Sequence, residues 1–200
     1  MSISSLLSRL VAWELLTAAS AYGLMTLLTG LSPRKNSQVG FFALGFSFMT
    51  LAMLAKFIAF LMPAPVGWKV DVPSSALIFM SAAAFSSGFA KPSSRPIAEI
   101  GVVSAGTALL AIGGDTPLGP KIIEACYGIL FLLTALLAAK VYLRARNHTL
   151  RALAIALLLV GLSGLASASS LLISWAPLEV LVSTLHIIGA LSFVWALVGA

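Results

Sequence analysis

The stretch KIIEACYGILFLLTALLAAKVYLRARNHTLRALAIALLLVGLSGLASASSLLI, from Lys121 to Ile173, decides the fold class. It holds two apolar runs, at 121–143 and 150–173, on either side of a short turn rich in arginine. Each run has the roughly 20 residues that a helix needs to cross a hydrocarbon core about 30 Å thick. The stretch therefore predicts two membrane-spanning helices joined by a basic loop.

The rest of the chain has the same apolar character. Of its 200 residues, 60% are hydrophobic and 9% are charged, and the mean hydropathy is +1.07. A water-soluble domain carries about 25% charged residues, so this supply cannot cover a water-facing surface. We predict an all-α integral membrane protein, with the lipid bilayer as its first partner.

Seven apolar stretches are separable, and they predict a bundle of seven transmembrane helices in a single polytopic domain covering residues 1–200. The third and fourth stretches are short for a bilayer. All nine prolines fall between the predicted spans or at their margins, so no span needs a kinked interior. The predicted spans are 8–30, 39–62, 74–90, 97–113, 121–143, 150–173 and 178–199.

The distribution of Lys and Arg predicts the orientation of this bundle. Basic residues in short loops collect on the cytoplasmic side of a membrane protein. One side would carry Arg34, Lys35, Lys91, Arg95, Lys140, Arg144, Arg146 and Arg151, and the other only Arg9, Lys69 and Lys121. We therefore expect the N-terminus outside and the C-terminus in the cytoplasm of a multi-pass protein of the cell membrane. Charges spread in this way form no continuous basic face, which excludes nucleic acid as a partner.

A weak internal repeat is compatible with the same architecture. The sequence LLTA at 15–18 recurs at 132–135, and a Gly-apolar-Ser triplet follows each copy, at 45–47 and 161–163. Two three-helix units joined by a central fourth helix, a 3+1+3 arrangement, would give this spacing. SWEET sugar transporters and rhodopsins would share that arrangement. Neither family is assigned, because the seventh span has no lysine for a retinal and no Pro-Gln pair occurs in the chain.

Counting from the span ends places every Asp, Glu, Lys and Arg within reach of an interface. Ionisable residues at the centre of a bilayer mark ion pathways or proton relays, and none is expected here. Glu14, Lys56 and Glu124 lie near the outer ends of their spans. They could form an outward-facing polar cluster, but the interpretation that we favour from sequence is three separate interfacial anchors.

His186 and a set of hydroxyls, Ser163 and Ser167 among them, remain deep in the predicted spans. Counted from the turn near Trp175, Ser163 and His186 lie at the same level, about 17 Å down at 1.5 Å per residue. Small residues at helical spacing, namely Gly161, Gly164, Ala168 and Gly189, predict that the sixth and seventh spans pack closely as a hairpin. In that hairpin we expect His186 to hydrogen-bond to a neighbouring helix, and the three polar residues are candidates for ligand contact or helix packing.

The sequence GLSG at 161–164, followed by HIIGA at 186–190, resembles the rhomboid family. That resemblance implies an intramembrane serine protease with Ser163 as nucleophile and His186 as its base. Rhomboids place a whole helix between these two residues, whereas here they lie on consecutive spans. The only asparagines, Asn36 and Asn147, fall in expected cytoplasmic loops, so the oxyanion partners of the family have no counterpart. The protease is a remote alternative, and we predict no catalytic residue.

No cofactor and no metal site are predicted. Neutral imidazole is a haem ligand, but the only other histidine, His148, lies in an expected loop. A haem held by His186 would therefore need a second ligand that is not histidine or that a partner supplies.

A hydrophobic, non-catalytic subunit or anchor of a larger membrane complex is the function that this sequence favours. Such a complex could be respiratory or otherwise transfer electrons, and the chain would pack against other membrane subunits or copies of itself and bind lipid or quinone. The main alternative is a small transporter of neutral solutes of the 3+1+3 type. A polar cavity open to one side of a single chain would favour the transporter.

Overall fold

The computed structural model describes residues 3–31, 37–89, 118–170 and 176–198. This part of the chain is helical, and its six helices are long and apolar enough to cross a membrane. They occupy six of the seven predicted positions. The predicted span 97–113 lies outside the described residues, and the count of seven and the 3+1+3 repeat stay predictions. The helices are α1 (Ile3–Gly30), α2 (Ser37–Leu61), α3 (Ala64–Phe89), α5 (Gly119–Ala145), α6 (His148–Ser169) and α7 (Ala176–Val198).

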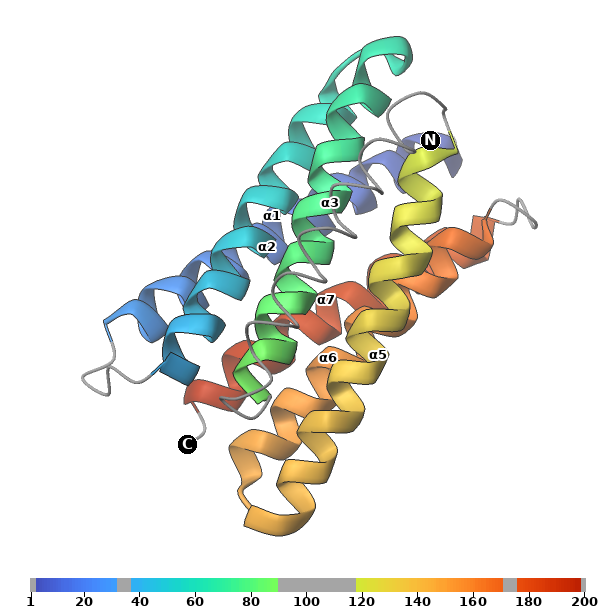
Figure 1. The fold of residues 1–200 in the computed structure, drawn as a ribbon. Coiled ribbons are helices and arrows are strands. Elements are labelled where there is room, and N and C mark those ends of the chain that lie inside the picture. The colour runs from blue at the N-terminus through green and yellow to red at the C-terminus, as the bar shows by residue number, and fades with distance from the viewer. Residues whose placement is uncertain (1–2, 32–36, 90–117, 171–175, 199–200) are drawn as a thin grey trace.

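The six described helices form a closed ring. Each one packs against two others, in the order α1, α2, α3, α5, α6, α7 and back to α1. Figure 1 shows that α1 and α7 run in the same direction, as do α3 and α5, so these parallel pairs join the antiparallel ones. The ring gives the described helices a shared interior, and α3 is buried along most of its length.

The turn between α5 and α6 shows how local sequence ends one helix and begins the next. Arg146 adopts a left-handed conformation with φ of 52°, and its N–H donates to the Tyr142 carbonyl at 2.7 Å. The side chain of Asn147 then accepts a hydrogen bond from the Thr149 N–H at 2.8 Å, which caps α6. Only two residues are needed to reverse the chain, so α5 and α6 are close antiparallel neighbours.

The third predicted span was wrong in its start and its length. Helix α3 begins ten residues before 74, at Ala64, and its apolar part alone, Lys69–Phe89, has 21 residues. Pro73 lies inside this helix, contrary to the expectation that no span contains a proline. Asp71, which read as a loop residue, pairs with Lys56 on α2, and this contact holds the first turns of α3 against α2. Tertiary contacts thus outweigh the weak helix signals of this segment.

The glycines of α6 pack against α5, not against α7 as predicted. A Cβ on Gly161 would lie 3.0 Å from the carbonyl oxygen of Gly128, and one on Gly164 would lie 2.5 Å from the Tyr127 ring. The predicted partner was wrong because α5 supplies its own glycine, Gly128, at the matching height. Helices α6 and α7 are also neighbours, and there Gly189 faces Val160 on α6.

Five aromatic side chains fill the middle of the ring, and we call them the aromatic layer. Phe46 lies 4.9 Å from Phe85 and 5.2 Å from Phe193, measured between ring centroids, and Tyr22 lies 5.9 Å from Phe193. All five side chains are buried. Since they come from α1, α2, α3, α5 and α7, the layer crosses the whole interior. It consists of Tyr22, Phe46, Phe85, Phe131 and Phe193.

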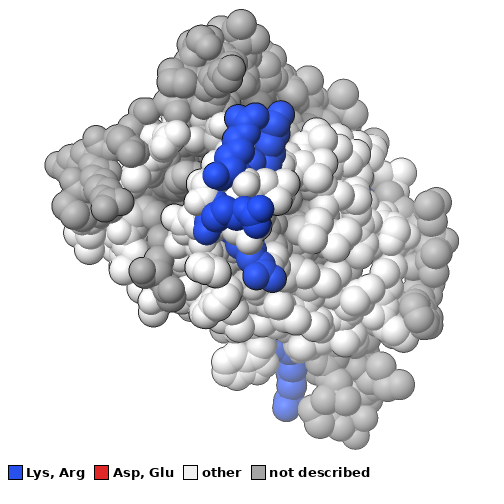
Figure 2. Space-filling model, turned by 90° about the horizontal axis from the view of Figure 1, so that it is seen from below, with Lys and Arg blue, Asp and Glu red and all other residues white. Residues whose placement is uncertain are grey.

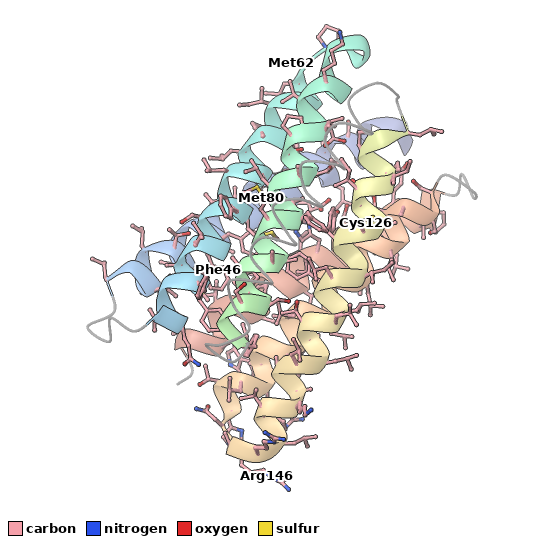
Figure 3. All side chains as sticks on the ribbon, in the orientation of Figure 1. Phe46, Met62, Met80, Cys126 and Arg146 are labelled. Atoms are coloured by element: carbon pink, nitrogen blue, oxygen red, sulfur yellow. The ribbon has the colours of Figure 1, made fainter. Side chains whose placement is uncertain are left out.

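Charge is divided between the two ends of the bundle. Figure 2 shows Lys and Arg side chains gathered on the end that carries the α5–α6 turn, and the exposed Lys140, Arg144, Arg146 and Arg151 flank that turn. In Figure 3 Arg146 marks this end and Met62, at the α2–α3 turn, marks the other. The acidic residues within the described ranges all belong to the Met62 end, where they line one cavity.

Candidate functional site

A polar cavity of about 530 Å³ opens at the end where α1, α3, α5 and α7 begin. All six described helices contribute to its wall. Apolar side chains such as Leu15, Met53 and Val182 line part of it. The rest of the wall carries ionisable side chains, namely Glu14, Lys56, Asp71, Lys121, Glu124, Glu179 and His186. Ionisable groups are costly in a bundle of this apolar character, so their gathering around one cavity points to function.

One side of the polar cavity holds a buried pair of an acid and an imidazole. The Glu14 carboxylate on α1 lies 2.7 Å from Nδ1 of His186 on α7, and its other oxygen accepts a hydrogen bond from Ser183 at 2.6 Å. The three side chains are 7%, 8% and 2% exposed. Ser183 and His186 are three residues apart on α7, so both reach the same carboxylate from one helix face.

A network of two lysines and two carboxylates forms the other side. Lys56 on α2 lies 2.8 Å from Asp71 on α3 and 3.1 Å from Glu124 on α5. Lys121 lies 2.9 Å from Glu124 and donates to Ser167 on α6, which in turn donates to Glu124 at 2.7 Å. The network links four consecutive helices of the ring, and Glu124 at its centre is 4% exposed.

The predicted site residues lie together in this cavity. Glu14, Lys56 and Glu124, the members of the predicted outer cluster, all line it. Lys56 and Glu124 form an ion pair, and Glu14 pairs with His186. The interpretation favoured from sequence, three separate interfacial anchors, does not fit this geometry. The sequence indicates how far along its helix a residue lies, but not whether its side chain points toward the interior of the ring.

Glu14 lies six residues after the start of the span Ser8–Gly30, near one end of the bundle, as its position in the sequence predicted. Its contact with Nδ1 of His186 shows that the two side chains are level. Glu14 is nevertheless buried, because α1 turns it toward the interior of the ring.

Ser163 and His186 line the same cavity, but their hydrogen bonds go elsewhere. Ser163 donates to the Val160 carbonyl of its own helix at 2.9 Å, while Nδ1 of His186 faces Glu14. The hydrogen bonds found in the described ranges include none between the two residues. Ser167, the third predicted candidate, belongs to the lysine–carboxylate network.

Sequence reasoning missed Asp71, Lys121 and Ser183 as site residues. The spacing of Ser183 and His186 was a usable signal, because residues three apart share a helix face. Asp71 carried no such signal, since its segment did not read as helix.

No group of three His, Cys, Asp or Glu side chains that could hold a metal ion occurs in the described ranges. His148 begins α6 at the opposite end of the bundle from His186.

A second cavity, of about 650 Å³, lies at the opposite end of the ring. It is mostly apolar and is lined by residues of α1, α2, α6 and α7, including Leu28, Phe42 and Leu153. Phe46 of the aromatic layer reaches it, and Tyr22, which stacks on Phe46, lies 6.1 Å from the His186 ring. The aromatic layer therefore separates two cavities that face opposite ends.

Comparison with known proteins finds no protein family, no curated protein and no solved structure that matches this chain. The arguments for function therefore come from the two cavities and the layer between them.

Proposed function

We propose that this protein is a membrane carrier for small polar solutes, and that the polar cavity is its solute-binding site. The proposal is based on a charged cavity inside an apolar ring of helices. The aromatic layer separates this cavity from a second cavity at the other end. Its volume falls in the range of roughly 300–1,000 Å³ that is typical of small-molecule sites.

The arrangement suits alternating access better than static packing. A carrier needs a site between two ends and a barrier that is closed on one side at a time. Here the polar cavity is open at one end, and the buried rings of Phe46, Phe85 and Phe193 are the barrier below it. The function favoured from sequence, a hydrophobic subunit or anchor, does not require buried charges. The cavity is also more highly charged than a carrier of neutral solutes requires.

We further propose that the polar cavity faces the outside of the cell. The exposed basic side chains beside the α5–α6 turn support this orientation, because Lys and Arg collect on the cytoplasmic side.

Filling the polar cavity should stop transport. In Val182→Trp an indole would occupy the cavity, whereas in Val180→Trp, two residues away, it would project from a side chain that is 42% exposed on the outer face. Both variants and the wild type would be reconstituted into liposomes. Uptake of radiolabelled ethanolamine, ethylene glycol, glycolate and glycine would then be measured against protein-free liposomes.

We expect at least one solute to enter faster with the wild type and with Val180→Trp, and at the protein-free rate with Val182→Trp. Uptake that survives Val182→Trp would show that the cavity is not the pathway. Protein-free rates for all four classes of solute would reject the carrier.

A further inference from the structure

The polar cavity contains more acid than base. Its wall carries four carboxylates, on Glu14, Asp71, Glu124 and Glu179, but the amines of only two lysines, Lys56 and Lys121. The lysines are both committed to Asp71 and Glu124. This leaves two carboxylates whose charge no lysine in the cavity balances.

These two carboxylates differ in their surroundings. Glu179 is exposed at the start of α7, where water can solvate it. Glu14 is buried, and its partners are the neutral hydroxyl of Ser183 and the imidazole of His186. A proton on His186, or a cation that enters the cavity, would place a positive charge directly beside the Glu14 carboxylate.

The shape of the cavity indicates what kind of cation could enter. A volume of about 530 Å³ far exceeds that of a bare inorganic ion, and no metal-binding group occurs in the described ranges. Leu15, Met53 and Val182 offer apolar wall beside the carboxylate, and Phe60 and Tyr127 offer aromatic rings. Apolar and aromatic surface next to a buried carboxylate fits an organic ammonium ion with a small hydrocarbon body.

We infer, on the basis of the proposed carrier function, that the solute is an organic ammonium ion, and that its ammonium group replaces the His186 proton as the counter-charge of Glu14. When the ammonium group binds Glu14, the N–H⁺ bond of His186 breaks and the proton leaves through the cavity to solution. No other bond changes. One ammonium ion is therefore exchanged for up to one proton.

Other polar and titratable groups also surround Glu14 and His186. The side chains that line the cavity from α6 and its C-terminal cap are serines, Ser163, Ser167 and Ser170. Tyr22 on α1 contacts the His186 ring. The remaining titratable and charged groups of the wall are Lys56, Asp71, Lys121, Glu124, Tyr127 and Glu179. Since Asp71 and Glu124 are already paired with lysines, the exchange is assigned to Glu14 and His186.

A matched set of probes tests the charge preference. Benzylamine, benzyl alcohol and benzoate share one ring and differ in the charge of the attached group. Binding to the purified full chain in detergent would be measured by calorimetry. We expect benzylamine, which stays protonated below pH 8, to bind at least tenfold more tightly than the other two. Equal or tighter binding of benzyl alcohol or benzoate would overturn the assignment of an ammonium ion.

The pH profile tests the exchange with a proton. At low pH protonated His186 competes for Glu14, and at high pH it does not. The affinity for benzylamine should thus rise with pH, by up to tenfold per pH unit. Calorimetry in two buffers of different ionisation enthalpy should show proton release on binding. An affinity independent of pH, or binding without proton release, would overturn the exchange.

Three variants assign the effects to residues. Glu14→Gln should weaken benzylamine binding at least tenfold, whereas Lys140→Gln, an exposed change at the opposite end of the bundle, should change it less than threefold. His186→Gln keeps a hydrogen-bonding group beside Glu14 but cannot carry the proton, so it should bind benzylamine tightly and without pH dependence. A pH dependence that persists in His186→Gln would place the proton on another group and overturn the inference, even if Glu14→Gln failed to fold.

The two proposals can fail separately. If benzylamine does not bind but Val182→Trp still abolishes uptake of another solute, the ammonium assignment is wrong and the carrier stands. If benzylamine binds as expected but no solute is taken up, the cavity binds ammonium ions without carrying them.

Discussion

At the scale of single residues, Lys56 is the side chain that joins the two carboxylates of its network. Its side chain is 15% exposed and contacts two carboxylates from two different helices. Lys56 neutralises part of the charge of both Asp71 and the buried Glu124. Removing it therefore leaves two carboxylates with less positive charge beside them. Breaking a buried ion pair costs about 3–5 kcal/mol in proteins, chiefly through the charge left behind.

Lys56→Met should therefore destabilise the fold. The ammonium group is lost while the apolar stem is kept, and we expect a loss of about 3 kcal/mol, because water in the cavity solvates part of the remaining charge. That loss corresponds to a fall of roughly 6–12 °C in the midpoint of thermal unfolding. Lys140→Met, which removes an exposed lysine from α5, should change the midpoint by less than 2 °C, within the roughly 0.5 kcal/mol that surface changes cost.

A second substitution checks the cause. Lys56→Met combined with Glu124→Gln removes a carboxylate together with its cation, so the double variant should unfold at a higher temperature than Lys56→Met alone. If the double variant is no more stable, the loss arises from packing and not from unbalanced charge.

At the scale of secondary-structure elements, α5 and α6 approach closely enough for backbone to face backbone at Gly128 and Gly161. Gly128 on α5 faces Gly161 on α6, and a Cβ on Gly128 would lie 2.9 Å from the Leu165 nitrogen. Backbone atoms cannot move aside as the end of a flexible side chain can. The two helices thus meet at a fixed distance, which holds Glu124 and Ser167 close enough to bond.

Gly128→Ala should therefore separate α5 from α6. Overpacking of a tight contact costs about 1–3 kcal/mol, and we expect a fall of roughly 2–12 °C in the midpoint of thermal unfolding. The control is Gly40→Ala in α2, where nothing lies within 4 Å of the added Cβ. It should leave the midpoint unchanged or raise it slightly, since alanine is the better helix former. Equal midpoints for the two variants would contradict the close contact.

The elements also show what sequence could and could not predict. Long apolar runs gave the positions of six helices to within a few residues at most ends, because hydrophobic length is a local property. The start of α3 was missed, since Asp71 and Pro73 read as loop until the partner on α2 is known. The pairing of α6 with α5 through glycine, and the rotation that brings Glu14 to His186, depend on helices far apart in sequence.

At the scale of the whole molecule, the two ends of the ring differ in charge, because the acidic side chains of the described ranges lie at one end only. Basic side chains lie beside the α5–α6 turn, the polar cavity opens at the other end, and the aromatic layer lies between them. Figure 3 shows Met62 and Arg146 at these two ends. Both side chains are exposed, so they can report from which side of a membrane each end is reached.

Cysteine labelling in intact cells should show the orientation. With the native Cys126 replaced by alanine, Met62→Cys should react with a membrane-impermeant maleimide added outside, because the positive-inside rule places the opposite end in the cytoplasm. Arg146→Cys should react only after the membrane is made permeable. The reverse pattern would mean that the polar cavity faces the cytoplasm.

The aromatic layer also has an electrical consequence. In the proposed orientation, water that fills the polar cavity would carry the outside potential down to the level of His186, so a membrane voltage would fall mainly across the rings and the apolar half of the bundle below them. A charge that crosses this distance alone exchanges about 2.3 kcal/mol with the field per 100 mV. An ammonium ion carried by itself would thus be drawn into a cell whose interior is negative. Exchange of one ammonium ion for one proton moves no net charge, so the membrane voltage would neither drive nor oppose such an exchange.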